Sequence, residues 1–122
     1  MADRLLSGRR VLVVEDEMLV LLNTEDMLAD LGCDHVTAAA TVDQALALIN
    51  AHRFDAAMLD MNLNGDRTYP VADALAACGT PFMFATGYVG HDIKEGYRDR
   101  PLLRKPFQNH QLAERFAELF DR

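Results

Sequence analysis

The sequence predicts an α/β fold in which helices cover both faces of a parallel sheet. Short apolar runs alternate with segments of helical periodicity along the chain, and this alternation is typical of such folds. The run at residues 11–14 is apolar at every position, as expected of a strand that is buried on both faces. With 122 residues, the chain is expected to form one domain, residues 1–122, with one core.

Composition argues against several classes of function. The chain carries 12 Lys and Arg against 19 Asp and Glu, so its formal charge is −7. Proteins that bind nucleic acid or anionic lipid need a basic face, which this balance does not favour. No apolar run approaches roughly 18 residues and no secretory signal is found, so we expect a cytoplasmic protein without a membrane anchor. The two cysteines, Cys33 and Cys78, do not make a disulfide framework and are expected in or near the core.

The first strand, residues 11–14, leads into a helix that is expected over about 17–31. Gly32 is a natural end for this helix, because glycine readily adopts the left-handed conformation that closes helices. A weaker strand is expected at residues 33–39. These three elements form the first strand–helix–strand unit of the predicted sheet.

The second helix begins with a capping-box pattern, in which the Thr41 hydroxyl is followed three residues later by Gln44. Apolar residues then recur on one helical face, at 42, 45, 46 and 49. A third strand is expected at residues 54–59 and ends at Asp60. This strand is the middle one of the predicted sheet.

Residues 61–66 contain two asparagines and a glycine and are interpreted as a loop. Pro70 suits the first turn of a third helix, where its missing N–H has no cost, and Gly79 closes that helix. The remaining expected elements are strands at 81–85 and 101–104 and a final helix with apolar residues at 112, 116, 119 and 120.

The stretch at residues 87–100 gives the weakest pattern. It holds three glycines and little apolar periodicity, so a fourth helix at this point is expected to be short or mobile. The five strands are expected in the flavodoxin-like order 2-1-3-4-5, which is a doubly wound parallel sheet. In this order the first, third, fourth and fifth strands are neighbours.

Charged and hydroxyl side chains follow these four neighbouring strands. In an open α/β sheet, ligands bind outside the carboxyl ends of the strands, so residues at those ends converge on one site. The residues placed there, in chain order, are Glu15, Asp16, Asp60, Thr86 and Lys105.

Three carboxylates at one sheet edge require a cation. Two carboxylates about 4 Å apart repel by ~4 kcal/mol at an effective dielectric constant of about 20, so three do not all stay ionised without compensation. Mg²⁺ resolves this, because it takes oxygen ligands and bridges carboxylates to phosphate. Lys105 and Thr86 add an ammonium and a hydroxyl, an arrangement that suits phosphoryl transfer. Asp60, on the middle strand, is the best-placed nucleophile.

Four motifs, in this order along the chain, resemble the receiver domain of two-component response regulators. Each motif alone is a weak signal, but the four together span the whole chain. In addition, one pair of segments resembles the FAT-GUY group of single-domain regulators, known mainly from alphaproteobacteria. The four motifs are VLVVEDE at 11–17, MLDMNLNG at 58–65, ATG at 85–87 and KPF at 105–107, and the further pair is YPVADAL at 69–75 with PFMFATGY at 81–88.

The resemblance implies a role for each residue at the sheet edge. Asp60 is implied to be the phosphoacceptor, with Thr86 as the switch hydroxyl and Lys105 as the counter-ion of the phosphate. Mg²⁺ is the implied cofactor, and the bond between Lys105 and Pro106 is expected to be cis. The implied metal ligands are Asp16, Asp60, the backbone carbonyl of Asn62 and, through water, Glu15.

Two features depart from the family pattern. Most receivers carry Tyr or Phe three residues before the lysine, whereas this chain has Leu102. Tyr88 is then the nearest candidate for the aromatic half of the switch, although Tyr88 and Tyr97 would equally cover the sheet edge. The interval from Thr86 to Lys105 is also shorter than usual, in agreement with the weak pattern of the fourth helix.

The function implied by the resemblance is that of a stand-alone phosphoacceptor. A sensor histidine kinase, often of the HWE type in this group, or a phosphotransferase would supply the phosphoryl group. The chain would promote its own phosphorylation and slow dephosphorylation without being an enzyme in the usual sense. It ends directly after the final helix, so no output domain is expected. It would then act by protein contact or as a phosphate sink, as a monomer or weak dimer.

Three alternatives stay open on the sequence. A Toprim-like metal-dependent nucleic-acid enzyme also places Glu after one strand and D-x-D after another, but the triplet here, Asp60-Met61-Asn62, is one carboxylate short. A haloacid-dehalogenase-like phosphatase needs the same D-x-D. A pseudo-receiver would bind partners without phosphorylation, which normally goes with a damaged site. We expect that only a receiver would gain one phosphoryl group from acetyl phosphate and Mg²⁺.

Overall fold

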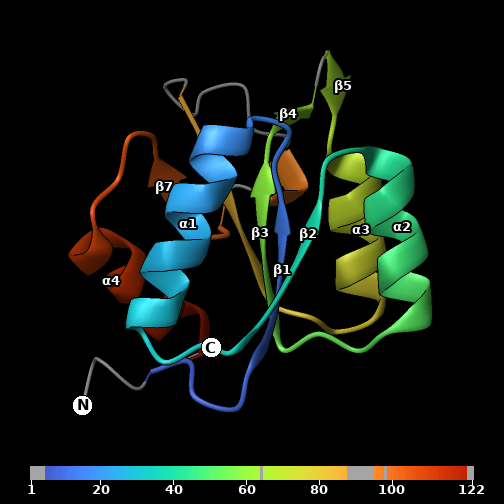
Figure 1. Ribbon diagram of the computed structural model, residues 1–122. Coiled ribbons are helices and arrows are strands. Elements are labelled where there is room, and N and C mark those ends of the chain that lie inside the picture. Colours follow the sequence, from blue (N-terminus) through green and yellow to red (C-terminus); the bar gives the residue numbers. More distant parts are fainter. Residues whose placement is uncertain (1–4, 64, 88–94, 98, 121–122) are drawn as a thin grey trace.

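The computed structural model describes residues 5–63, 65–87, 95–97 and 99–120. Within these ranges, five parallel strands form the central sheet in the order β2-β1-β3-β6-β7 (Figure 1). Counted along the chain, this is the expected order 2-1-3-4-5, so the predicted fold class is confirmed. The strands are β1 (Arg10–Val14), β2 (His35–Ala39), β3 (Ala56–Asp60), β6 (Phe82–Thr86) and β7 (Leu102–Arg104).

Among the described residues, four α-helices cover the sheet in two pairs. Figure 1 shows α2 and α3 on one face and α1 and α4 on the other. None of these helices is long and apolar enough to cross a membrane. The helices are α1 (Met18–Asp30), α2 (Val42–Ala51), α3 (Tyr69–Ala77) and α4 (Asn109–Phe120).

The side chains of β1 divide alternately between two apolar cores. Leu12 and Val14 belong to the core beneath α2 and α3, whereas Val11 and Val13 belong to the core beneath α1 and α4. All four side chains are at most 3% exposed. A strand with a core on each side needs apolar residues at every position, which explains the continuous apolar run in the sequence.

The predicted helix ends are confirmed. The Gln44 N–H donates to the Thr41 hydroxyl oxygen at 3.1 Å, and the Gln44 side-chain oxygen accepts from the Ala40 N–H at 2.9 Å. The first bond satisfies a backbone donor that the start of a helix otherwise leaves unpaired, and the second ties the helix to the residue that precedes its N-cap. Gly32 and Gly79, just past α1 and α3, have φ angles of 91° and 74°, which glycine adopts without steric cost.

Residues 61–66 were expected to be a loop, and this was wrong in detail. Strand β4 (Asn62–Leu63) pairs antiparallel with β5 (Asp66–Arg67), so a small hairpin follows β3. Two contacts explain the hairpin. The Leu63 side chain is 2% exposed and anchors it to the core beneath α2 and α3, and the Asn62 side-chain oxygen accepts from the Gly65 N–H at 2.8 Å.

The two cysteines differ. Cys33 is buried, as expected, whereas Cys78 is exposed, so its predicted place in or near the core was wrong. Cys78 is the residue that terminates α3, and the buried residues of that helix lie further back, at Val71, Ala72 and Leu75. The apolar spacing of the helix therefore does not extend to its last position.

The expected fourth helix is short in the part of the chain that is described. Between β6 and β7 the structure contains a three-residue 3₁₀ helix, η2 (Glu95–Tyr97). Residues 88–94 and 98 lie outside the described ranges, so the predicted mobility of this segment remains a prediction.

Strand β7 forms one margin of the sheet and is held by α4. The Arg115 Nε donates to the backbone carbonyl of Leu102 at 3.2 Å, and its guanidinium also pairs with Glu118 at 2.9 Å. On the other side of β7, Leu102 pairs with Phe84 of β6.

Candidate functional site

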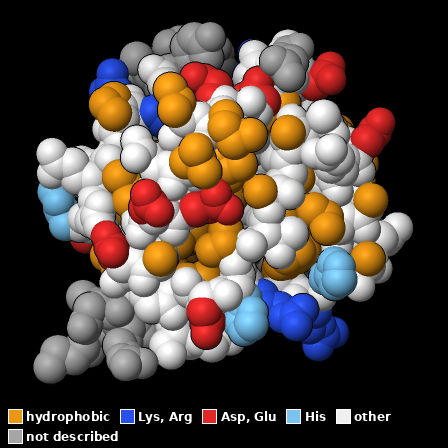
Figure 2. All heavy atoms as spheres, viewed as in Figure 1, with side chains coloured by type: hydrophobic (Ala, Val, Ile, Leu, Met, Phe, Trp, Pro, Cys, Tyr) orange, Lys and Arg blue, Asp and Glu red, His pale blue; other side chains and the backbone are white. Residues whose placement is uncertain are grey.

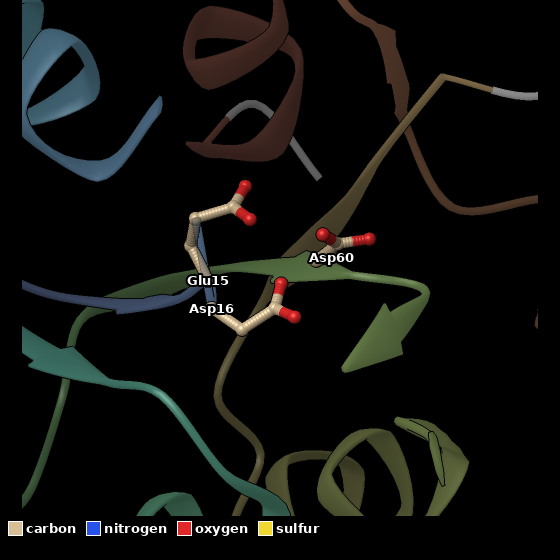
Figure 3. A group of neighbouring side chains, drawn as sticks. All are labelled: Glu15, Asp16 and Asp60. Atoms are coloured by element: carbon tan, nitrogen blue, oxygen red, sulfur yellow. The ribbon is translucent and has the colours of Figure 1, made fainter. Parts of the chain in front are cut away.

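Three acidic side chains meet where β1 and β3 end. Glu15 and Asp16 directly follow β1, and Asp60 is the last residue of β3. Because these strands are parallel neighbours, their carboxyl ends lie at the same edge of the sheet (Figure 3). One carboxylate oxygen from each residue lies within 4.8 Å of the others. Glu15 is 5% exposed, whereas Asp16 and Asp60 are half-buried.

Lys105 binds two of these carboxylates. It follows β7, and its backbone N–H donates to the carbonyl of Thr86, the last residue of β6, at 2.8 Å. Its Nζ lies 2.6 Å from Glu15 Oε1 and 3.0 Å from Asp60 Oδ2. The peptide bond to Pro106 is cis, as expected. Thr86 is 1% exposed and ends the fourth strand, and Lys105, after the fifth strand, brings an ammonium to the acidic cluster.

Backbone N–H groups hold the remaining carboxylate oxygens. Glu15 Oε2 accepts from the Glu17 N–H at 3.2 Å, and Asp60 Oδ1 accepts from the Asn62 N–H at 3.2 Å. Each carboxylate thus has a bond to Lys105 on one oxygen and a bond to the chain two residues later on the other. This arrangement fixes the orientation of both side chains at the carboxyl edge of the sheet.

The charges of the site influence one another. Burial raises the pKa of the Glu15 carboxyl above its usual value, and the charge of Asp60 adds to this effect, although the hydrogen bond from Lys105 works against it. Burial alone would lower the pKa of Lys105, but its hydrogen bonds to Glu15 and Asp60 outweigh burial, so that pKa is raised. Lys105 therefore stays charged at neutral pH. One ammonium beside three carboxylates still leaves the site negative, which favours a hard cation.

A cleft of about 590 Å³ opens over this cluster. Its walls combine acidic and amide groups with apolar side chains, so it offers both oxygen donors and apolar contact. The residues that line it are Asp16, Glu17, Val20, Asn23, Thr24, Met27, Asp60, Asn62, Gly87, Lys105, Pro106 and Phe107.

Helix α1 also carries exposed apolar residues outside the cleft lining. Met18 is 65% exposed, Leu19 80% and Leu22 51%. Figure 2 shows apolar side chains gathered over this helix, with acidic side chains among them. Large apolar side chains that lie together on a surface are typical of protein contacts.

The structure brings together the residues that the sequence placed at the strand ends. Glu15, Asp16, Asp60 and Lys105 form one cluster or line its cleft, and Thr86 ends the adjacent strand. Asn62 also lines the cleft. Tyr88, the predicted partner of the switch hydroxyl, lies outside the described residues.

Tyr97 is an aromatic residue whose contacts the sequence left undetermined. Its ring stacks on Tyr69, with centroids 6.1 Å apart and planes at 9°, and packs edge-on against Phe82 and Phe84. Its hydroxyl donates to the carboxylate of Asp73. Tyr97 thus ties η2 to α3 and covers this part of the sheet, in agreement with the covering role expected of it. No periodicity in the sequence identifies such a contact, because it joins residues 24 positions apart.

Fold and site together define a class of domain, the CheY-like α/β fold with acidic residues at the ends of its first and third strands. Residues 11–117 match the model of the response regulator receiver domain, so this chain belongs to the receiver domain family. Receiver domains bind Mg²⁺ at an acidic pocket and interact with histidine kinases or phosphotransfer proteins.

Similar proteins include known response regulators. The solution structure of SdrG from Sphingomonas melonis Fr1 is 42% identical and has a TM-score of 0.83, covering 95% of this chain and 98% of SdrG. The receiver domain of PhyR from Erythrobacter litoralis is 28% identical, with a TM-score of 0.81 over 94% of this chain and 92% of that one. The transcriptional regulatory protein PdtaR of Mycobacterium tuberculosis is 29% identical over 85% of this chain. The match covers 53% of PdtaR, so this chain spans about half the length of that curated relative.

Proposed function

We propose that this chain accepts a phosphoryl group on Asp60 from a phosphohistidine of a sensor kinase or phosphotransferase, in a reaction that requires Mg²⁺. The observation that carries the proposal is the position of Asp60. It ends the central strand, lines the cleft, pairs with the Lys105 ammonium at 3.0 Å, and shares one cluster with the carboxylates of Glu15 and Asp16. A half-buried carboxylate with an ammonium beside it and oxygen ligands for a cation around it suits the transfer of a phosphoryl group onto it.

The donor set fits Mg²⁺. Asp16, Asp60 and the backbone carbonyl of Asn62 would bind the ion directly, and Glu15 through water. All four offer oxygen, the ligand atom that Mg²⁺ prefers, and the cleft leaves room for the waters that this ion retains. When bound, the ion would neutralise part of the negative charge that gathers on the phosphoryl group during transfer.

The side chains of this site would carry out the phosphoryl transfer itself. An Asp60 carboxylate oxygen attacks the phosphorus of the phosphohistidine, the P–N bond breaks, and its electron pair leaves with the imidazole nitrogen. The product is an acyl phosphate on Asp60. Lys105 would then pair with a phosphoryl oxygen, and the Thr86 hydroxyl would donate to another. Water would later attack the phosphorus, so that the chain slowly dephosphorylates itself.

The donor would be a protein, a sensor kinase of the HWE type. A protein donor must approach the cleft to bring its phosphohistidine to Asp60. The exposed Met18, Leu19 and Leu22 lie outside the cleft lining but on α1, the helix that forms one of its walls, and would supply an apolar surface for such a partner. The chain would act in the cytoplasm as a monomer or weak dimer. It would pass the signal on by protein contact or serve as a phosphate sink.

The test is incubation with acetyl phosphate and Mg²⁺, followed by the mass of the intact protein. We expect a gain of one phosphoryl group, and no gain when Asp60 is replaced in Asp60→Asn or when EDTA removes Mg²⁺. A wild-type protein that gains nothing would favour the pseudo-receiver alternative. Equal labelling of Asp60→Asn would move the acceptor to another residue. The Toprim-like alternative has no support from the comparisons, because residues 11–117 match the receiver family.

A further inference from the structure

Thr68 is a buried threonine that contacts the backbone of Asp60. Its side chain is 1% exposed, and its hydroxyl donates to the Asp60 carbonyl oxygen at 2.6 Å. Its backbone N–H donates to the next carbonyl, that of Met61, at 3.2 Å. Two donors of one residue thus hold two successive carbonyls at the end of β3, eight and seven residues earlier in the chain.

The position of Thr68 makes this use of its hydroxyl unusual. Thr68 is the N-cap residue of α3, where a threonine side chain ordinarily accepts from a backbone N–H of the first helical turn. At this helix the cap bond is not made. Pro70, in the first turn, has no N–H, and the N–H groups of Val71 and Ala72 both donate to the Thr68 carbonyl at 3.0 Å. The first turn of α3 therefore leaves few N–H groups for the Thr68 hydroxyl to accept from, and the hydroxyl donates to the Asp60 carbonyl instead.

The bond from the Thr68 N–H reaches the carboxylate of Asp60 through the rigid Met61–Asn62 peptide. The carbonyl of Met61 and the N–H of Asn62 belong to the same planar peptide unit. When the Thr68 N–H holds the Met61 carbonyl, it also sets the direction of the Asn62 N–H, which donates to Asp60 Oδ1 at 3.2 Å. The hydroxyl holds the carbonyl of Asp60 itself. Backbone and side chain of Asp60 are thus both oriented from Thr68.

We infer that Thr68 is a positioning residue for the phosphoacceptor, whose hydroxyl holds Asp60 in the orientation that phosphoryl transfer and Mg²⁺ binding require. This inference rests on the proposed function of Asp60. Thr68 does not touch the reacting atoms, and it acts through the Asp60 carbonyl and the Met61–Asn62 peptide. The hydroxyl holds the backbone of Asp60, which is both the proposed phosphoacceptor and a proposed Mg²⁺ ligand, so metal binding and phosphorylation should respond together.

The decisive comparison is Thr68→Val against Thr68→Ser. Valine keeps the shape of threonine and removes the donor, whereas serine keeps the donor. Thr80→Val is the matched control, because Thr80 is also buried but precedes β6 at the opposite end of the strands. Each variant is titrated with Mg²⁺, and its phosphorylation rate is measured over a range of acetyl phosphate concentrations. Circular dichroism checks that each one folds.

We expect Thr68→Val to lower the maximal phosphorylation rate and the Mg²⁺ affinity by about threefold to tenfold, the worth of one hydrogen bond. The acetyl phosphate concentration at half-maximal rate should change little, and Thr68→Ser and Thr80→Val should behave as the wild type. A purely structural role would lower the stability of Thr68→Val and leave both readouts unchanged, and that result would overturn the inference. If Thr68→Val does not fold, Thr68→Ala is judged by the same two readouts.

The experiment also separates this inference from the proposed function. If the wild type is not phosphorylated, the proposed function fails, and the Mg²⁺ titration alone decides whether Thr68 positions Asp60. A wild type that binds no Mg²⁺ either would overturn both. A wild type that is phosphorylated at the same rate as Thr68→Val, with the same Mg²⁺ affinity, would leave the proposed function standing and overturn the role of Thr68.

Discussion

The ammonium of Lys105 would compete with a bound Mg²⁺ for the same carboxylates. Its ammonium is bonded to Glu15 at 2.6 Å and to Asp60 at 3.0 Å, the same side chains that we propose for the Mg²⁺ site. A bound dication and an ammonium around one carboxylate repel each other. Lys105 thus lowers the charge of the site enough to keep three carboxylates together, and by the same effect weakens the hold of the site on a metal ion.

Replacing Lys105 with Met should therefore tighten Mg²⁺ binding while slowing phosphorylation. We expect the affinity for Mg²⁺ to rise by about tenfold, since removal of one nearby positive charge is worth at least about 1.4 kcal/mol in a partly buried site. The phosphorylation rate should fall, because the phosphoryl oxygens lose their counter-ion. Calorimetric titration with Mg²⁺ and the mass of the protein after acetyl phosphate treatment measure the two effects.

Arg104→Met is the control for Lys105→Met. Arg104 is exposed and adjacent in sequence, so its removal changes the net charge by the same amount outside the cluster. An Mg²⁺ affinity that is unchanged or reduced in Lys105→Met would show that the ammonium does not compete with the metal.

At the scale of elements, the contact between η2 and α3 has a pH dependence of its own. Burial, the hydrogen bond to Asp73 and the charge of Asp73 raise the pKa of Tyr97 from 10.0 to about 12. Because the folded-state pKa exceeds the unfolded value, the neutral phenol stabilises the fold fully below pH 10. That stabilisation disappears as the pH rises through about 12.

The free energy of unfolding should then fall more steeply between pH 10 and about 12 in the wild type than in Tyr97→Phe. Near pH 8, Tyr97→Phe should be less stable by about 1 kcal/mol, the usual loss for one hydrogen bond. Urea denaturation at several pH values measures both. Parallel curves for the two proteins would contradict the prediction. In Asp73→Asn, the ultraviolet titration of Tyr97 should move back toward pH 10.

The elements that the sequence predicted well are those with long apolar patterns. The run at 11–14 predicted a strand between two cores, and Leu12 and Val13 do face opposite cores. The hairpin of β4 and β5 escaped prediction, because strands of two residues are too short for any periodicity. It is held by single contacts, the burial of Leu63 and the bond between Asn62 and Gly65.

The residues of the candidate site also fall into those that the sequence predicted and those that it did not. Glu15, Asp60 and Lys105 were predictable, because the carboxyl ends of parallel strands converge wherever the sheet order is known. Thr68 was not, because a threonine at a helix start predicts a cap, and only the geometry shows that its hydroxyl bonds to the Asp60 carbonyl instead. The contacts of Tyr97 could not be predicted, since its partners Tyr69 and Asp73 come from another part of the chain.

For the molecule as a whole, the acidic cluster should couple metal binding to stability. The chain has a formal charge of −7, and the cluster gathers three of its carboxylates within 4.8 Å. An ion that binds only the folded state stabilises it by an amount that grows with its concentration, about 2.7 kcal/mol at 100 times the dissociation constant. Mg²⁺ should therefore raise the melting temperature, and EDTA should reverse the rise.

Asp16→Asn should reduce the rise in melting temperature that Mg²⁺ causes, because it changes the melting temperature both without and with the ion. With one carboxylate fewer, the protein should melt at a higher temperature without Mg²⁺ and gain little when Mg²⁺ is added. Asp26→Asn, an exposed acid on α1 outside the cleft lining, should keep the full gain. Thermal melts with Mg²⁺ and with EDTA test this, and an equal rise in all three proteins would place the ion elsewhere.

The hydrogen bond from Arg115 to the Leu102 carbonyl has a consequence for aggregation at high protein concentration. A strand at the margin of a sheet presents free backbone groups to which a strand from another chain can add, and this is a route to aggregation. In β7 the Arg115 guanidinium occupies the Leu102 carbonyl, and the strand is only three residues long. A foreign strand would have to displace a charged side chain to gain a short ladder of hydrogen bonds. Helix α4 thus protects this margin of the sheet against edge-to-edge polymerisation.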